Sequence, residues 1–230
     1  MQHIVKGGTA FSALQVNLQK GEWIKAEKNA MMAMSGDLTL SARMDGGFLR
    51  GLARKFSGES FFFQEIRAEK GPGWVMLAPV SPGAVTAVEL DGKTELTAEK
   101  GAFLAATEHV NVSSTVQHLG KAIFGGEGFV VVKIGGRGTV FFGGFGAIEM
   151  ITLTPEQDIV VDNTHLVAWE DSVTYNLAKG GTSWMSAVLG GEAITARLKG
   201  PGRVWVQTRT VGAFKAWLGV LPYQLKSATK

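Results

Sequence analysis

Three segments of the sequence follow one pattern, and this repetition constrains the fold more than any single motif. In each segment an acidic residue follows a short apolar stretch, and a two-residue turn and an apolar strand come next. The segments are WIKAEKNAMMAM at residues 23–34, ELTAEKGAFLAA at 95–106 and IVVDNTHLVAW at 159–169. A pattern that recurs in units of about 65 to 70 residues indicates a threefold duplication.

A second acidic residue follows a glycine in each unit. Glu59, Glu127 and Glu192 are these residues, in SGESFFF, GGEGFVVV and GGEAITARL. The distance from the first acid to the second is 32, 28 and 30 residues (27 to 59, 99 to 127 and 162 to 192). We therefore divide a single β domain, residues 1–210, into repeats at about 10–90, 91–155 and 156–210.

The composition within these units predicts strands. The chain holds 31 glycines among many valines, threonines and phenylalanines, which favours short strands joined by tight turns. TLSAR, VNVSSTV and VTYNLA alternate polar and apolar residues, as half-buried strands do. The expected fold is all-β, of the double-stranded β-helix type, with three repeats around a pseudo-threefold axis that share one core. Short helical segments are expected at GLARKF, GKAIF and WMSAVL.

Residues 211–230 fall outside the repeat pattern. VGAFKAWLGVLPYQLKSATK is amphipathic enough for one short helix, which we expect to end before Pro222, followed by a frayed tail.

The glycine-rich stretch at residues 123–146 resembles a phosphate-binding loop when it is taken alone. It lacks the G-x-x-x-x-G-K-[ST] string, and Phe141 stands where a dinucleotide fingerprint needs its third glycine. We interpret Gly135, Gly136 and Gly138 as a hairpin turn with positive φ angles.

Glu59, Glu127 and Glu192 have two interpretations. Equivalent carboxylates around an axis would bind a cation or a basic partner segment. The favoured alternative is structural, because an acid after glycine commonly accepts backbone N–H bonds at a turn. The four histidines show no metal-ligand spacing, and the chain has no cysteine. No catalytic, metal-binding or cofactor-binding residue is therefore predicted.

Aromatic residues are the other candidates for binding. They would stack bases or line a ligand pocket, but core packing is the favoured role. Half of each consecutive set is expected to face outward or into an interface, and the exposed half would promote self-association. The residues are Phe61, Phe62, Phe63, Phe141, Phe142, Trp184, Trp205 and Trp217.

Charge and hydropathy exclude some partners. The formal net charge is +3, but no run of basic residues suggests nucleic-acid binding. The long uncharged stretch at residues 71–88 contains three prolines, which argues against a membrane helix. With no secretory signal at the N-terminus, a cytoplasmic location is expected.

Several motifs resemble one known family. GESFFF, GAFLAAT, GGEGFVVVKI with GRGTVFFGGFGAIE, and VDNTHLVAWEDSVTY with GPGRVWVQTRT are similar to the bacterial and archaeal relatives of yeast altered-inheritance-of-mitochondria protein 24 (mitochondrial biogenesis). The resemblance covers about residues 10–210. It implies a repeated β fold similar to the tryptophan RNA-binding attenuation protein (TRAP), without an established enzymatic activity.

These observations lead to a ranked expectation about function. The first hypothesis is a non-enzymatic protein that acts as a homo-oligomer, or as a scaffold for another protein or a membrane-associated complex. The alternative is a module that binds RNA or a small ligand in aromatic grooves between repeats. An enzyme ranks third, because no nucleophile, base or metal set is recognisable.

Overall fold

Strands with alternating polar and apolar residues build most of this structure. The computed structural model describes residues 1–44, 62–119, 129–178 and 195–227. In the strand at residues 110–119, for example, Val110 and Val112 are buried while Asn111 and Ser113 are exposed. Strands dominate the described residues and a single α-helix follows them, so the predicted all-β class is confirmed. The short helical segments expected at GLARKF, GKAIF and WMSAVL lie outside the described residues.

The first group of strands forms two small ladders around β6 and β7. In one, β7 lies between β2 and β4, and β1 extends it beyond β2; in the other, β6 lies between β3 and β5. The strands are β1 (Gln2–Lys6), β2 (Ala13–Leu18), β3 (Trp23–Glu27), β4 (Met31–Met34), β5 (Thr39–Met44), β6 (Phe62–Arg67) and β7 (Gly73–Leu77).

The second group is organised around one long strand, β12. Its first half pairs with β9 and β11, and its second half pairs with β8 and β10. The elements are β8 (Val85–Asp91), β9 (Leu96–Glu99), the 3₁₀ turn η1 (Lys100–Ala102), β10 (Phe103–Thr107), β11 (Val110–Leu119) and β12 (Phe129–Gly143).

The third group again uses two central strands, β17 and β18. β17 pairs with β14 and β16, and β18 pairs with β13 and β15. The elements are β13 (Ile148–Leu153), β14 (Asp158–Asp162), the 3₁₀ turn η2 (Asn163–His165), β15 (Leu166–Glu170), β16 (Thr174–Ala178), β17 (Thr195–Lys199) and β18 (Gly202–Gln207).

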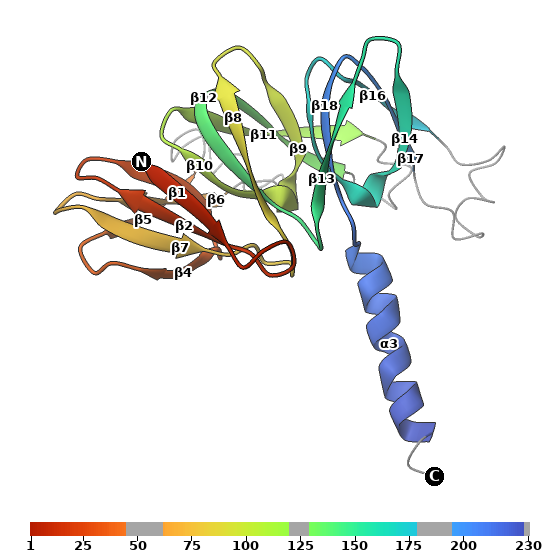
Figure 1. The fold of residues 1–230 in the computed structure, drawn as a ribbon, viewed down its shortest axis with the longest axis horizontal. Coiled ribbons are helices and arrows are strands. Elements are labelled where there is room, and N and C mark those ends of the chain that lie inside the picture. The colour runs from red at the N-terminus through yellow and green to blue at the C-terminus, as the bar shows by residue number, and fades with distance from the viewer. Residues whose placement is uncertain (45–61, 120–128, 179–194, 228–230) are drawn as a thin grey trace.

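Two antiparallel ladders join the three groups. β3 of the first group pairs with β10 of the second, and β9 of the second pairs with β15 of the third. The groups therefore follow one another from left to right in Figure 1, with the second group in the middle.

The predicted hairpin turn at Gly135, Gly136 and Gly138 is wrong, because β12 continues through these residues without a break. Gly136 and Gly138 do have positive φ, +94° and +136°, but Gly135 does not. A Cβ atom on Gly136 would lie 2.3 Å from the carbonyl oxygen of His109, and one on Gly138 would lie 2.2 Å from Thr107 Oγ1. The glycines let the strand change direction between its two ladders, where neighbouring strands approach closely.

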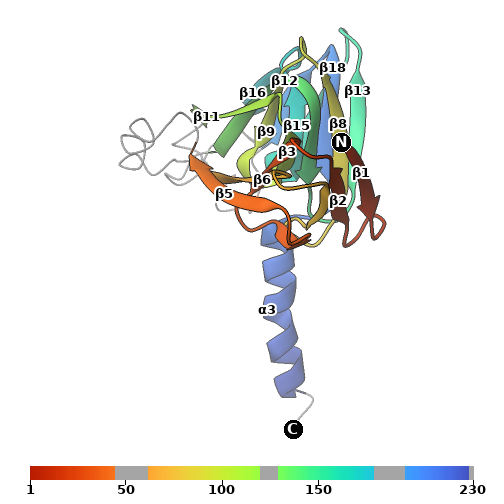
Figure 2. The same ribbon diagram turned by 90° about the vertical axis from the view of Figure 1, so that its left-hand side faces the viewer.

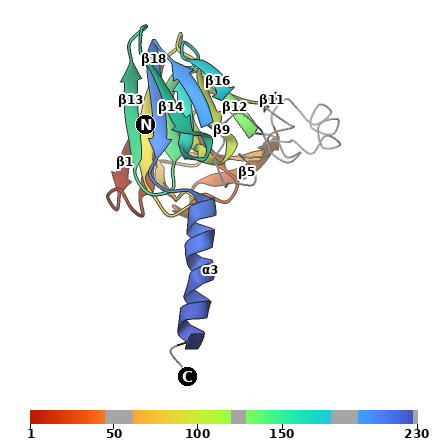
Figure 3. The same ribbon diagram turned by 90° about the vertical axis from the view of Figure 1, so that its right-hand side faces the viewer.

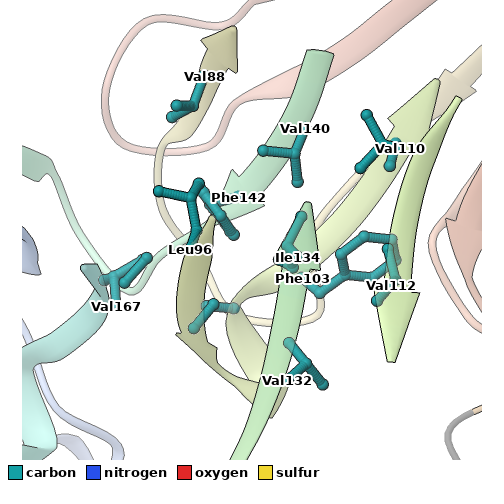
Figure 4. Packing of buried hydrophobic residues seen from close by; sticks show 14 of the residues in the cluster. Val88, Leu96, Phe103, Val110, Val112, Val132, Ile134, Val140, Phe142 and Val167 are labelled. Carbon is teal, nitrogen blue, oxygen red and sulfur yellow. The ribbon is translucent and has the colours of Figure 1, made fainter. Parts of the chain in front are cut away.

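The buried side chains form three clusters rather than the one shared core that the repeats predict. The central cluster lies in the second group, where Leu96, Phe103 and Phe142 pack together and Val167 joins them from the third group (Figure 4). Each group encloses its own apolar interior, and strands shared at the junctions connect them.

Phe141 and Phe142 were expected to face opposite environments, one of them outward. They do point to opposite sides of β12, but both are fully buried, because Phe141 packs into the first group's cluster and Phe142 into the central one. A strand that is covered on both faces buries consecutive aromatic residues.

The α-helix α3 (Val211–Ser227) extends away from the strands, as the views from two sides show (Figures 2 and 3). The prediction of a helix that ends before Pro222 is wrong in its end point, since the helix continues through this proline. Proline lacks the backbone N–H that would bond a carbonyl oxygen in the preceding turn. In a helix that projects into solvent, water can bond to that carbonyl oxygen.

The central cluster generates a test of stability. Phe142→Ala removes a fully buried ring that packs 6.5 Å from Trp205, centroid to centroid. We expect the free energy of unfolding to fall by about 3–5 kcal/mol, measured by urea denaturation. Val80→Ala, at an exposed loop position, is the control and should change it by less than about 0.5 kcal/mol. A loss below about 1 kcal/mol for Phe142→Ala would contradict the packing described.

Candidate functional site

The acidic residues predicted from the sequence, Glu59, Glu127 and Glu192, all lie outside the described residues. The structure therefore does not test the prediction of a carboxylate ring or of turn-capping carboxylates at these positions. Phe61 and Trp184 also lie outside the described part of the chain.

The other three acids of the sequence pattern are described, and each is the last residue of a strand. Glu27 ends β3, Glu99 ends β9 and Asp162 ends β14. Glu27 Oε2 accepts the backbone N–H of Asn29 at 3.2 Å, and Asp162 Oδ1 accepts that of Thr164 at 3.0 Å. These two carboxylates stabilise the turns that follow them.

Glu99 differs from the other two, because its side chain lines a cavity of about 460 Å³. The lining residues come from the loop between β7 and β8, from η1, from the strands of the second and third groups and from the first turns of α3. They are Val80, Ser81, Pro82, Glu99, Gly101, Ala102, Gly143, Phe145, Leu166, Gln207, Val211 and Phe214.

Two aromatic residues shape the outer wall of this cavity. Phe145 and Phe214 meet edge to face, with ring centroids 5.1 Å apart, and this contact holds the first turns of α3 against the strands. The Gln207 side chain is fixed as well, since its Oε1 accepts the N–H of Phe145 at 2.8 Å and its Nε2 donates to the Thr164 carbonyl oxygen at 3.0 Å. The cavity is thus formed by residues that are already held in place.

Glu99 is the one ionisable side chain among the described residues of the lining. Burial raises the pKa of its carboxyl group above the ordinary 4.5, and the nearby N–H groups of Gly101 and Ala102 and the charge of Lys100 only partly oppose this. When protonated, this carboxyl group can donate one hydrogen bond to a ligand in the cavity. This arrangement suits a small, mostly apolar molecule with a polar end.

The sequence analysis noted Glu99 in the repeat pattern but did not select it as a site residue. The pattern predicts the same role for Glu27, Glu99 and Asp162. Glu99 differs because α3 and the loop before β8 lie close to it and form the cavity with it. No local signal at residue 99 could have identified the cavity.

The histidines occupy separate structural positions. The ring of His3 packs edge-on against Phe141 at 4.9 Å between centroids, and Nδ1 of His165 lies 2.6 Å from the carbonyl oxygen of Gln207. Within the described ranges, no three histidine or acidic side chains lie close enough together to hold a metal ion.

The aromatic residues largely pack inside, as the favoured interpretation predicts. Phe63, Phe141, Phe142 and Trp205 are buried, and Trp217 on α3 is exposed. Phe145 and Phe214, which line the cavity, were not among the predicted aromatic residues.

Comparison with protein families gives one match across nearly the whole chain. A family model described as mitochondrial biogenesis AIM24 matches residues 4–209. An uncharacterized protein of Streptococcus pyogenes serotype M6 is 29% identical over 226 residues, which are 95% of this chain and 90% of that protein.

A fungal relative is similar over a shorter region. The mitochondrial altered inheritance of mitochondria protein 24 of Yarrowia lipolytica is 28% identical over 170 residues, which are 72% of this chain and 53% of that protein. The alignment thus spans about half the length of the fungal relative.

A solved structure shares the fold. A crystal structure of a Streptococcus pyogenes protein, determined as a structural genomics target, superposes with a TM-score of 0.79 and is 26% identical in sequence. The match covers 96% of this chain and 99% of that one.

The raised pKa of Glu99 generates a prediction about pH. Because the folded state favours the protonated carboxyl group, wild-type stability should fall as the pH rises above about 4.5, up to the raised pKa. Glu99→Gln has no charge to bury, so its free energy of unfolding should exceed that of the wild type increasingly over this window. Urea denaturation of both proteins at several pH values measures the difference.

Asp91→Asn is the matched control, with the opposite sign. Hydrogen bonds from the N–H groups of Thr94 and Lys93 lower the pKa of Asp91 to about 2. This carboxylate stabilises the wild type above pH 3.8, and the effect is lost as the pH falls towards about 2. If Glu99→Gln and the wild type keep a constant difference from pH 4 to 9, the assignment of a raised pKa to Glu99 is wrong.

Proposed function

The chain belongs to the mitochondrial biogenesis AIM24 family, and from this premise we propose that it acts by assembly, as a non-enzymatic scaffold. The family match confirms the resemblance found in the sequence motifs, and the family includes bacterial as well as fungal proteins. The first partner in this proposal is another copy of the chain. A further protein or a membrane-associated complex would bind to the assembly.

Exposed apolar side chains are the observation that carries this proposal. Large apolar residues are exposed on strands β4, β13 and β14 and along the first half of α3. Those on the first half of α3 lie together, and grouped apolar exposure of this kind is typical of surfaces that another molecule covers. The residues are Met32, Met150, Val160, Val211, Phe214, Trp217 and Leu218.

Helix α3 adds surface for such contacts. Phe214 and Trp217 stack with ring centroids 5.7 Å apart on its exposed side. None of the helices among the described residues is long and apolar enough to cross a membrane. The cytoplasmic location expected from the sequence stays a prediction.

We further propose that the chain is a threefold duplication of one TRAP-like unit of the double-stranded β-helix type. Recurring pairings support this, because in each group the strand after the acidic turn pairs with the last strand of the group. In all three pairings the register is interrupted at the second residue of the strand after the turn. The residues at these three interruptions are Met32, Leu104 and Val167. The repeat boundaries at about residues 90 and 155, and the pseudo-threefold axis, stay predictions.

The cavity beside Glu99 favours a second candidate function, the binding of a small ligand between the second and third groups. It corresponds to the grooves between repeats that the sequence suggested. RNA binding, the other form of that hypothesis, stays a prediction. It would appear as binding to mixed RNA that weakens steeply as salt is added.

The proposal of assembly predicts the mass of the protein in solution. We expect light scattering coupled to size-exclusion chromatography to give a multiple of the 24.5 kDa chain mass that grows or persists as the concentration rises. A single-chain mass at concentrations up to about 1 mM would overturn it, because specific assemblies are far tighter than that.

The proposal of ligand binding predicts an effect of the cavity wall. Native mass spectrometry and thermal shifts with a library of small apolar acids and amides should reveal ligands. Phe214→Ala should weaken their binding by about tenfold, because its ring lines the cavity and loses its contact with the ligand. Leu218→Ala is the control, since Leu218 lies on the same helix outside the cavity. Equal binding by both variants would contradict the site.

A further inference from the structure

Two ladders join the three strand groups, and both are formed by strands at corresponding positions relative to the acidic turns. In each, the strand after an acidic turn, β10 or β15, pairs with the strand before the acidic turn of the preceding group, β3 or β9. The registers correspond as well. Ala105 lies opposite Ala26 in the first junction, and Ala168 lies opposite Ala98 in the second.

Two strands with the corresponding places in the pattern do not form this junction within the described residues. β4 follows the acidic turn of the first group, and among the described strands only β7 pairs with it. β14 precedes the acidic turn of the third group, and among the described strands only β17 pairs with it. Both are edge strands among the described sheets. They lie on opposite sides of the molecule in Figure 1, and β14 lies towards the viewer in Figure 3.

Burial shows what the junction does to the strand after the turn. Leu104 and Val167, the residues at the ladder interruptions of β10 and β15, are 2% and 1% exposed, because they pack into the cluster of the preceding group. Met32 holds the same place in β4 and is 56% exposed. A preceding group would cover it.

The strand before the turn shows the same contrast. Lys25 in β3 and Thr97 in β9 lie at the centre of the two junctions and are 9% and 2% exposed. Val160 is their counterpart in β14 and is 56% exposed. β14 also lacks the lysine, proline or bulge that commonly prevents an edge strand from pairing with another chain.

The backbone of β4 is directed towards the missing strand. The N–H of Ser35 donates to the carbonyl oxygen of Trp74 in β7 at 2.9 Å. Because hydrogen-bonding groups alternate in direction along an antiparallel strand, the N–H and C=O of Met34 face the open edge. A strand placed there would form a hydrogen-bonded pair at Met34 and a non-hydrogen-bonded pair at Ala33.

We propose that β14 of one copy pairs antiparallel with β4 of a second copy, with Val161 opposite Ala33 and Val160 opposite Met34. The second copy is the occupant because the two junctions within the chain already specify this pairing and this register. Met32 would then pack on the third group's cluster, beside Ile159 and Val161.

This contact is heterologous, since it uses different surfaces of the two copies. Successive copies therefore close into a ring or continue as a fibre. The inference rests on the proposed function of assembly and assigns the surfaces that produce it.

Disulfide trapping tests the register, because the natural chain contains no cysteine. Full chains carrying Ala33→Cys and Val161→Cys are mixed and oxidised, and a covalent two-chain product is expected on a non-reducing gel. Non-hydrogen-bonded pairs bring Cα atoms to about 4.5 Å, within the range that a disulfide spans.

Two controls make this result specific. Ala33→Cys mixed with Ile159→Cys shifts one thiol along β14 by two residues, and about a tenfold lower yield is expected, because the diagonal separation of about 7–8 Å is too long for a disulfide. Ala33→Cys alone should give no covalent dimer. If it dimerises as readily as the mixture, β4 pairs with β4 of another copy and the proposal is wrong.

Charged substitutions test the two edges without disturbing the interior, since both side chains are exposed. Met32→Asp should prevent another strand from pairing with β4, and Val160→Asp should prevent pairing with β14. Each variant alone should therefore elute as a single chain in size-exclusion chromatography. Their dissociation constants should rise by about a hundredfold or more, because a carboxylate without a partner is costly to bury. Mixed together they should form a dimer that stops at two copies, since each retains one intact edge. Phe11→Asp, at an exposed position between β1 and β2, should assemble like the wild type.

The outcomes separate this inference from the broader proposal. If the wild type is a single chain at every concentration, both the proposed function and this inference are wrong. If the wild type assembles, but Met32→Asp and Val160→Asp assemble equally well and the register pair does not cross-link, only this inference is overturned.

Discussion

The backbone pairing of β12 is the interaction on which the rest of the structure depends. Its two halves pair with β9 and β11 and with β8 and β10, so one strand holds together the whole second group. Because β10 also pairs with β3, and β9 with β15, the first and third groups attach to the molecule through neighbours of β12. Gly136 and Gly138 make this continuous strand sterically feasible.

The need to pair strand edges connects the fold to the proposed function. Within the chain, each junction satisfies the backbone groups of two strands, and Leu104 or Val167 is buried in the cluster of the preceding group. At the two ends of the chain the same strands remain edges, with Met32 and Val160 in solvent. A scaffold that assembles through these edges would extend the interaction that already holds its own parts together.

The cavity beside Glu99 arises from a different constraint, the way in which chain segments leave the strands. The loop before β8 and the first turns of α3 converge on η1, and together with Glu99 they line one cavity. Glu27 and Asp162 also end strands, and their carboxylates accept N–H groups of the turns that follow. Similar local sequences thus have different surroundings, since Glu99 lines a cavity formed with segments that are distant in the chain.

The sequence by itself determined the strands, because alternation of polar and apolar residues is a local property, as in Val110 to Ser113. It also identified the family and the acidic turns at Glu27, Glu99 and Asp162. Only the tertiary structure decided that β12 runs unbroken through Gly135 to Gly138, that Phe141 and Phe142 are both buried, and that α3 covers Glu99. These features depend on contacts between residues far apart in the chain, and a local pattern holds no information about which distant strand or helix will cover it.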